Sequence, residues 1–344
     1  MSVIAPFRIR AVGALVMVNL LWGISFPVMK AANQIMAGTQ TGRDADHFTA
    51  ACFLIAVRFS LALVLLGLLM PRLFLGLRRE HWSMGAWVGL AFSVGFVLQI
   101  VGLNYIPASR SGFLTSLSVI FTPIAMVVLE RRMPRLGVLV GALAALLGTG
   151  ILTGMFELRG RFKIRLAVDS LGSMGIGDWL TVLAAVIFTV QLLLIDHFSR
   201  RMPAGQLTPG MFVATLGLGS VAFLIGHSTQ ASATSGVEWT SLLVDGRFML
   251  LILIMSFFCT VLAFHWMNKY QPHVSATQAA MIYTLEPTFA TLWAMVLPDI
   301  LSRTMHLSYP SERPGLELLV GGLLIVTGNA LALWPEATSH PSRS

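Results

Sequence analysis

The stretch Phe248–Asn268, FMLLILIMSFFCTVLAFHWMN, contains no Asp, Glu, Lys or Arg along its whole length. A helix needs about 20 mostly apolar residues to cross a bilayer, and this stretch meets that requirement. A helix is the expected conformation because every backbone polar group in lipid needs a partner within its own segment. Ser111–Leu129 and Leu136–Phe156 are equally free of charged residues. The sequence therefore predicts a protein that crosses a membrane several times.

The composition of the whole chain agrees with this prediction. Of its 344 residues, 56% are hydrophobic and 11% are charged, and the mean hydropathy is +0.79. A soluble domain carries about 25% charged residues, so most of this surface is expected to face lipid. The net charge of +8 comes from short basic clusters between apolar runs, the distribution that orients membrane proteins. Nucleic acid is not expected as a partner, and Cys52 and Cys259 are expected to be small buried side chains.

Ten segments have the length and hydropathy of transmembrane helices. They are 11–34, 50–70, 84–106, 107–129, 135–155, 177–197, 208–228, 248–268, 274–298 and 315–334. Most Lys and Arg residues outside these spans lie on the side of the N-terminus, which predicts that both termini are cytoplasmic. The basic loop 158–176 argues against this orientation, and we interpret it as an interfacial segment whose cations lie at the lipid headgroups.

Matching positions in the two halves of the chain indicate an internal repeat. Asn104, Ser111 and Pro123 align with Asn268, Ser275 and Pro287, and Gly141 and Gly148 align with Gly321 and Gly328. Because each half has five spans, the second half enters the membrane from the opposite side, as in alternating-access carriers. The predicted fold is therefore an all-α integral membrane protein with ten transmembrane helices as two inverted five-helix repeats.

This repeat sets the predicted domain boundaries. The first repeat is 1–157, the linker is 158–176, and the second repeat is 177–334 with an inserted loop at 299–314. Residues 335–344 form a polar tail. The glycines of the fifth and tenth spans predict either close helix packing within the chain or a homodimer.

Several motifs resemble the EamA-like family of the drug/metabolite transporter superfamily. Leu21–Phe26, LWGISF, is similar to the family's opening motif, and Val57-Arg58-Phe59 to the start of its second helix. Arg110–Pro123 resembles its fourth helix, and Cys259–Ala290 resembles its eighth and ninth helices. The resemblance covers roughly 11–334. The family often has an acidic residue closing the ninth helix, and here Leu297-Pro298-Asp299 and the extra loop occupy that region.

The resemblance implies a secondary transporter of a small metabolite in a bacterial inner membrane, with efflux of amino acids or related compounds as the leading expectation. Uptake or movement of a lipid-linked substrate is an alternative within the superfamily, and an intramembrane enzyme or a scaffold is an alternative of a different class. The chain has no G-x-S-x-G, H-E-x-x-H or P-loop, so neither catalysis, a cofactor, a metal nor ATP hydrolysis is expected. Coupling to a proton gradient or simple facilitated exchange is expected.

Charged residues within the predicted spans are the first candidates for function. Glu286 lies near the middle of the ninth span, where an acidic residue costs about 2.5–3.5 kcal/mol. It is either a proton-coupling group or a support for the kink at Pro287. Arg58 either attracts an anionic substrate, pairs with Glu286 or reaches the headgroups. The other candidate substrate-binding residues are polar or aromatic positions in the spans: Trp22, Ser25, Gln99, Arg110, Thr115, Gln191, His265, Gln278 and Tyr283.

Overall fold

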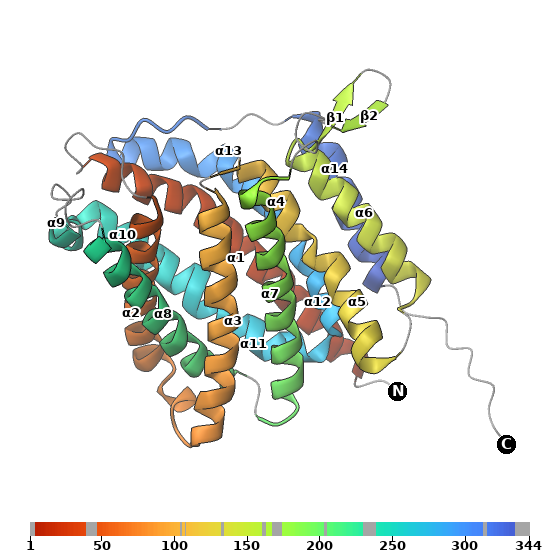
Figure 1. Cartoon of the computed structure of the whole chain (residues 1–344), viewed down its shortest axis with the longest axis horizontal. Helices are drawn as coiled ribbons and strands as arrows, with labels where there is room; N and C mark the ends of the chain where they lie inside the picture. The colour runs from red at the N-terminus through yellow and green to blue at the C-terminus, as the bar shows by residue number, and fades with distance from the viewer. Residues whose placement is uncertain are drawn as a thin grey trace.

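The computed structural model describes residues 4–38, 47–103, 105–106, 108–131, 134–159, 163–166, 174–202, 205–229, 239–311 and 315–333. Its first half contains α1 (Ile4–Gly38), α2 (His47–Leu69), η1 (Pro71–Leu73), α3 (Arg79–Leu103), α4 (Ala108–Ser116), α5 (Ser118–Glu130) and α6 (Leu136–Leu152). A hairpin of β1 (Phe156–Arg159) and β2 (Lys163–Leu166) follows. Figure 1 shows the helices packed side by side in one bundle, with this hairpin projecting at one end.

The second half is also helical. It contains α7 (Ile176–Ser199), α8 (Leu207–Thr229), α9 (Trp239–Val244), α10 (Gly246–Ile254), η3 (Met255–Leu262), α11 (Ala263–Tyr270), η4 (Gln271–His273), α12 (Ala276–Tyr283), α13 (Glu286–Met305) and α14 (Leu316–Leu333). Element η3 is a π-helix that joins α10 to α11.

Nine helical segments within the described ranges are long and apolar enough to cross a membrane. They correspond to nine of the ten predicted spans. The remaining prediction, 135–155, falls on α6, a shorter apolar helix of 17 residues. The prediction of a helical protein with many membrane spans is confirmed.

Two of the spans are interrupted, although the apolar pattern predicted continuous helices. The fourth span breaks at Leu117, whose N–H donates to the Leu114 carbonyl at 3.2 Å. The ninth breaks between α12 and α13, where the Leu285 N–H donates to the Ile282 carbonyl at 3.1 Å. Pro287 lacks an N–H and cannot continue the α-helical ladder from α12. Broken helices in a membrane are tolerated where protein surrounds the freed backbone groups.

Two predicted loop boundaries need correction. The ninth span continues through Pro298 to Met305, so the first part of the predicted inserted loop 299–314 is helical. Leu301 and Met305 are buried against α1, and this packing offsets the hydrogen bond lost at Pro298. Part of the predicted linker 158–176 forms the antiparallel hairpin, in which Arg159 pairs with Lys163. The predicted polar tail, 335–344, lies outside the described residues.

Helices α6 and α14 pack at van der Waals distance through their glycines. A Cβ added to Gly141 would lie 2.4 Å from the Gly328 carbonyl oxygen, and one added to Gly148 would lie 2.6 Å from that of Gly321. The order of these contacts shows that the two helices are antiparallel. The four glycines therefore permit close packing between helices of one chain.

Helices α3 and α7 are antiparallel as well. A Cβ on Gly102 would meet the Gly177 carbonyl oxygen at 3.0 Å, and a Cβ on Gly95 would meet the ring of Phe188 at 2.8 Å. Positions later in α3 thus contact positions earlier in α7. Because α3 and α7 are antiparallel, the segment between them must cross the membrane an even number of times.

Candidate functional site

Arg58, on α2, is held by the π-helical segment η3. Its Nε donates to the Thr260 hydroxyl at 2.6 Å and its Nη2 donates to the Cys259 carbonyl at 3.1 Å. In return the Ser256 hydroxyl donates to the Arg58 carbonyl at 2.9 Å. Two helices far apart in sequence are therefore joined through both the side chain and the backbone of one residue.

The π register is what brings Thr260 into position. Its hydroxyl donates to the Met255 carbonyl, five residues earlier, at 3.0 Å, while accepting from Arg58. A π-helix widens the turn and is frequent at functional sites. The neutral oxygens of this segment thus surround a cation that lipid alone would not solvate.

The first helix supplies the third contact of Arg58. Nη1 donates to the Ser25 hydroxyl at 3.2 Å. Ser25 lies two residues before Pro27, which has no N–H to offer the Gly23 carbonyl and so loosens α1 at this level. We call Ser25, Arg58, Cys259 and Thr260 the Arg58 cluster. It connects α1, α2 and η3.

Three aromatic rings lie next to this cluster. The ring of Trp22 lies 5.3 Å from that of Phe264 and 5.4 Å from that of Tyr283, between centroids. The Trp22 indole Nε1 is buried and has no hydrogen-bond partner among the described residues. The Tyr283 hydroxyl donates to Gln271 Oε1 at 3.1 Å, and Gln271 Nε2 donates to the Leu192 carbonyl at 3.0 Å. These bonds hold the Tyr283 ring in place against Trp22.

Glu286 does not pair with Arg58. It is the first residue of α13, directly after the break that follows α12. Its carboxylate is partly buried and has no hydrogen-bond or ion-pair partner within the described part of the chain. The two ion pairs formed there are Arg200–Asp196 and Arg247–Asp245. The hypothesis that Arg58 is neutralised by Glu286 is therefore wrong for this conformation.

The other predicted residues lie in different surroundings. Gln99, on α3, donates to the Thr115 hydroxyl on α4 at 2.8 Å. Gln278 accepts from the Ser275 N–H and forms the capping box of α12, which is a structural role. His265 lies beside Gly205, and its Nδ1 is buried without a partner in the described chain.

For two predicted residues the structure describes no hydrogen bond or ion pair. Gln191 is buried on α7. Arg110 belongs to α4, but its side chain lies outside what the structure describes. Of the predicted set, the structure thus brings together Trp22, Ser25, Arg58 and Tyr283 at one place, and Gln99 with Thr115 at another.

Sequence reasoning missed Ser256 and Thr260, the residues of η3 that bond to Arg58. The signal was present, because they are two hydroxyl side chains one helical turn apart in an otherwise apolar span. Their use depends on the π register, which side-chain periodicity does not show.

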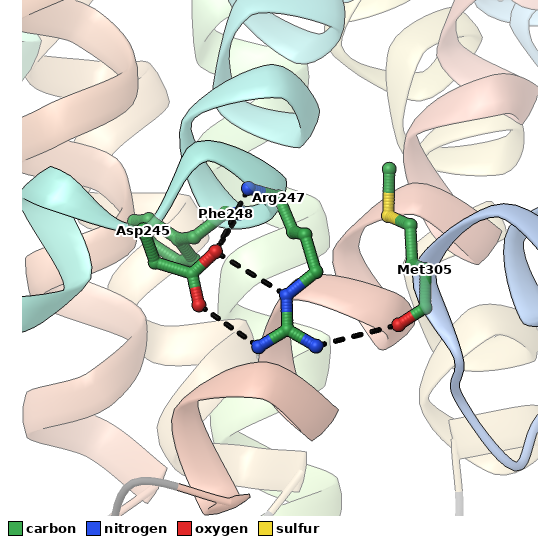
Figure 2. Close-up of polar contacts among 4 residues, drawn as sticks. All are labelled: Asp245, Arg247, Phe248 and Met305. Carbon is green, nitrogen blue, oxygen red and sulfur yellow. Dashed lines mark hydrogen bonds and ion pairs between the residues drawn. The ribbon is translucent and has the colours of Figure 1, made fainter.

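A second polar group joins the ends of α10 and α13, as Figure 2 shows. Asp245 caps α10 by accepting from the N–H groups of Arg247 at 2.8 Å and Phe248 at 3.3 Å. Arg247 Nη2 donates to Asp245 Oδ2 at 3.1 Å, and Nη1 donates to the Met305 carbonyl at 3.4 Å. The hydrogen bond from the Arg247 side chain lowers the pKa of Asp245. We call Asp245, Arg247 and Met305 the α10–α13 latch.

The segment after α13 is tied to α1 at the same end of the bundle. Gln34 Nε2 donates to the Ser308 carbonyl at 3.3 Å, and Lys30 Nζ lies 4.9 Å from the centroid of the Tyr309 ring. The Ser302 hydroxyl donates to the Tyr309 carbonyl at 2.7 Å. With the latch, these contacts hold α1, α10 and α13 together at one end.

Comparison with known proteins agrees with this architecture. A curated relative from Archaeoglobus fulgidus, named an uncharacterized transporter, is 27% identical over 300 residues, covering 87% of this chain and 82% of the relative. A solved structure, described only as the crystal structure of a protein, matches with a TM-score of 0.63 at 17% identity, covering 94% of this chain and 96% of that chain. This second likeness shows the fold. The family model for EamA-like transporters matches residues 9–154 and again 175–334. The chain is a membrane transporter and belongs to the EamA-like transporter family.

Proposed function

We propose that the protein is a secondary transporter with ten membrane crossings, arranged as two inverted repeats, which moves a small metabolite by alternating access. The repeats are 1–157 and 177–334, joined by 158–176. The crossings in order are α1, α2, α3, α4–α5, α6, α7, α8, α10–α11, α12–α13 and α14.

The observation that supports this proposal is the pattern of helix contacts. If each crossing is exchanged for its counterpart in the other half, the main contacts map onto one another. The contact between α3 and α8 corresponds to the contact between η3 and α2. The contact between α3 and α7 corresponds to the contact between α11 and α1. The contact between α1 and α13 corresponds to the contacts of α7 with α4 and α5. The contacts of α2 with α8 and of α6 with α14 map onto themselves. Such exchange is expected of inverted repeats with a site between them.

The helix directions support a crossing by α6. Helices α3 and α7 are antiparallel. If α4–α5 crosses the membrane and α6 did not, α7 would run parallel to α3. The short α6 therefore counts as a crossing, and the chain has an even number of them. Both termini then lie on one side, which we infer to be the cytoplasm of a bacterial cell because of the basic clusters.

For the substrate we propose amino acids or related compounds, moved outward in exchange for protons. The aromatic rings and Arg58 lie at the junction of α1, α2 and η3, and Glu286 stands at the break of the ninth crossing without an ion-pair partner in the described chain. A carboxyl group in such a position can gain and lose a proton without breaking another contact, which suits a coupling group. The Pro287 kink alone does not require an acidic residue.

The test is flux in proteoliposomes that carry the full chain. We expect an imposed proton gradient to drive a labelled amino acid from a screened panel in the direction opposite to the proton flow, with a matching proton flux. The Glu286→Gln variant is expected to bind the same compound but to lose proton movement, because the amide has nearly the same shape and does not titrate. Equal proton flux in both proteins would remove Glu286 from the coupling step. The absence of flux for the whole panel would contradict transport of this substrate class.

A further inference from the structure

The positive charge of Arg58 has no counter-charge within the described residues. A guanidinium has five N–H donors, and three of its bonds are accounted for by Thr260, Ser25 and the Cys259 carbonyl. All three acceptors are neutral. Arg58 is partly buried within a membrane span, where a cation is costly unless it is paired. The Arg58 cluster therefore fixes the orientation of the guanidinium and leaves its charge unbalanced.

A further donor without a partner lies next to this cation. The Trp22 Nε1 is buried and has no acceptor in the described chain, and a buried N–H without an acceptor is costly. Trp22 lies one turn before Ser25 on α1, and its ring contacts Phe264, one turn after Thr260. Because Ser25 and Thr260 both contact Arg58, the Trp22 indole lies about one helical turn, ~5 Å, from the level of the guanidinium.

We propose that Arg58 and the Trp22 indole N–H bind the carboxylate of the transported substrate, whose apolar part packs against the rings of Phe264 and Tyr283. This inference rests on the proposed transport function and names the chemical class of its substrate. Two guanidinium N–H groups remain for the acceptor, the number that a bidentate carboxylate takes.

The charge of the site selects a monocarboxylate over a phosphate ester. Arg58 contributes one positive charge, whereas a phosphate monoester carries nearly two negative charges at neutral pH. Lys30 lies against Tyr309 on the loop that follows α13 and is two turns of α1 beyond Trp22. It therefore does not supply a second charge to the Arg58 cluster.

A purely structural role for Arg58 would predict a different response to mutation. As a structural link, Arg58 needs only Ser25, Thr260 and the Cys259 carbonyl, and the Trp22 N–H has no part in it. Trp22→Phe removes that N–H and keeps an aromatic ring against Phe264 and Tyr283. Trp179→Phe is the matched control, because Trp179 is 60% exposed on the outer surface of α7.

The experiment measures binding to the full chain in lipid nanodiscs by isothermal calorimetry and by ligand-induced thermal stabilisation. The probes are L-leucine, L-phenylalanine and 3-phenylpropionate, each paired with its carboxamide. We expect the carboxylates to bind at least about tenfold more tightly than the amides, since a hydrogen bond to a charged group contributes about 1.5–3 kcal/mol. Trp22→Phe should weaken binding of the carboxylates about tenfold and leave the affinity for the amides unchanged. Trp179→Phe should change none of these values.

Equal affinity for each acid and its amide, or no binding of either, would overturn the proposal. So would carboxylate affinity that Trp22→Phe leaves unchanged. Parallel flux measurements separate this inference from the proposed function. Transport of the amides or of amines without carboxylates would reject the substrate class and retain the transporter. Saturable carboxylate binding with no flux would retain the site and reject transport of these compounds.

Discussion

At the residue scale, the Thr260 hydroxyl is the contact that positions Arg58. It accepts from Arg58 Nε at 2.6 Å and donates to the Met255 carbonyl at 3.0 Å. Thr260→Val should lower the free energy of unfolding by about 1.5–3 kcal/mol, because it leaves a charged donor without its acceptor. Thr260→Ser retains the hydroxyl and should stay within about 0.5 kcal/mol of the wild type. Reversible unfolding in mixed micelles measures both, and equal stability of the two variants would contradict this account.

The sequence identified part of the Arg58 cluster and could not identify the rest. A charged, hydroxyl or large aromatic side chain within an apolar span indicates a possible functional residue, and this criterion identified Arg58, Ser25, Trp22 and Tyr283. It did not identify Thr260 and the Cys259 carbonyl, because their use depends on a five-residue turn that side-chain periodicity does not encode. Gln278 differs from these residues, because its capping box with Ser275 at the start of α12 is a local pattern that the sequence itself contains.

At the scale of elements, the contact between α6 and α14 depends on four glycines. A methyl group on Gly141 would lie 2.4 Å from the Gly328 carbonyl oxygen, so the helices must move apart. Gly141→Ala should therefore destabilise the protein by about 1–3 kcal/mol. Gly217→Ala, on α8, meets nothing within 4 Å and should be neutral or stabilising by up to about 1 kcal/mol. Thermal unfolding in detergent gives the comparison. A neutral Gly141→Ala would show that the two helices are not in contact.

The α10–α13 latch predicts a dependence on pH. The hydrogen bond from Arg247 lowers the pKa of Asp245 relative to the unfolded chain, so the stabilisation is fully present above the unfolded value of about 3.9. It is lost as the pH falls through the lower folded value. Asp245→Ala removes the cap of α10 and should cost about 1 kcal/mol at pH 7.

The difference between Asp245→Ala and the wild type should shrink when unfolding is measured below about pH 4. Thr304→Ala is a suitable control, because its hydroxyl bonds only within α13 and it does not titrate. A mutational effect at Asp245 that is the same at pH 7 and pH 3 would contradict the assignment of its carboxylate to the latch.

Span positions were more predictable than their ends and interruptions. Hydropathy located nine spans, because a charged residue in lipid is costly and membrane spans therefore contain few of them. The end of α13 was misplaced because Pro298 and Asp299 read as a loop, whereas burial of Leu301 and Met305 against α1 continues the helix. Such a contact between distant segments is not visible in a local sequence pattern.

At the scale of the whole molecule, the number of crossings decides whether the two halves are inverted. Close contacts show that α3 and α7 are antiparallel. If α4–α5 crosses the membrane, as we propose, this direction requires α6 to cross as well. If α6 instead lay along the surface, the two halves would have the same orientation and would not be inverted. The inverted repeat and the transport cycle therefore depend on the shortest of the predicted crossings.

Single-cysteine labelling measures the side on which each connection lies. Cys52 and Cys259 are buried, so the wild type provides a low background. Arg78, before α3, and Arg201, after α7, are exposed, and Val244, before α10, is 84% exposed. With ten crossings, Arg78→Cys and Arg201→Cys should react with an impermeant maleimide from the same side, and Val244→Cys from the opposite side. With α6 on the surface, Arg201→Cys would instead react from the side opposite to Arg78→Cys. If the maleimide labels Arg78→Cys and Arg201→Cys in inside-out vesicles and Val244→Cys in intact cells, the side shared by the first two is the cytoplasm, as the basic clusters predict.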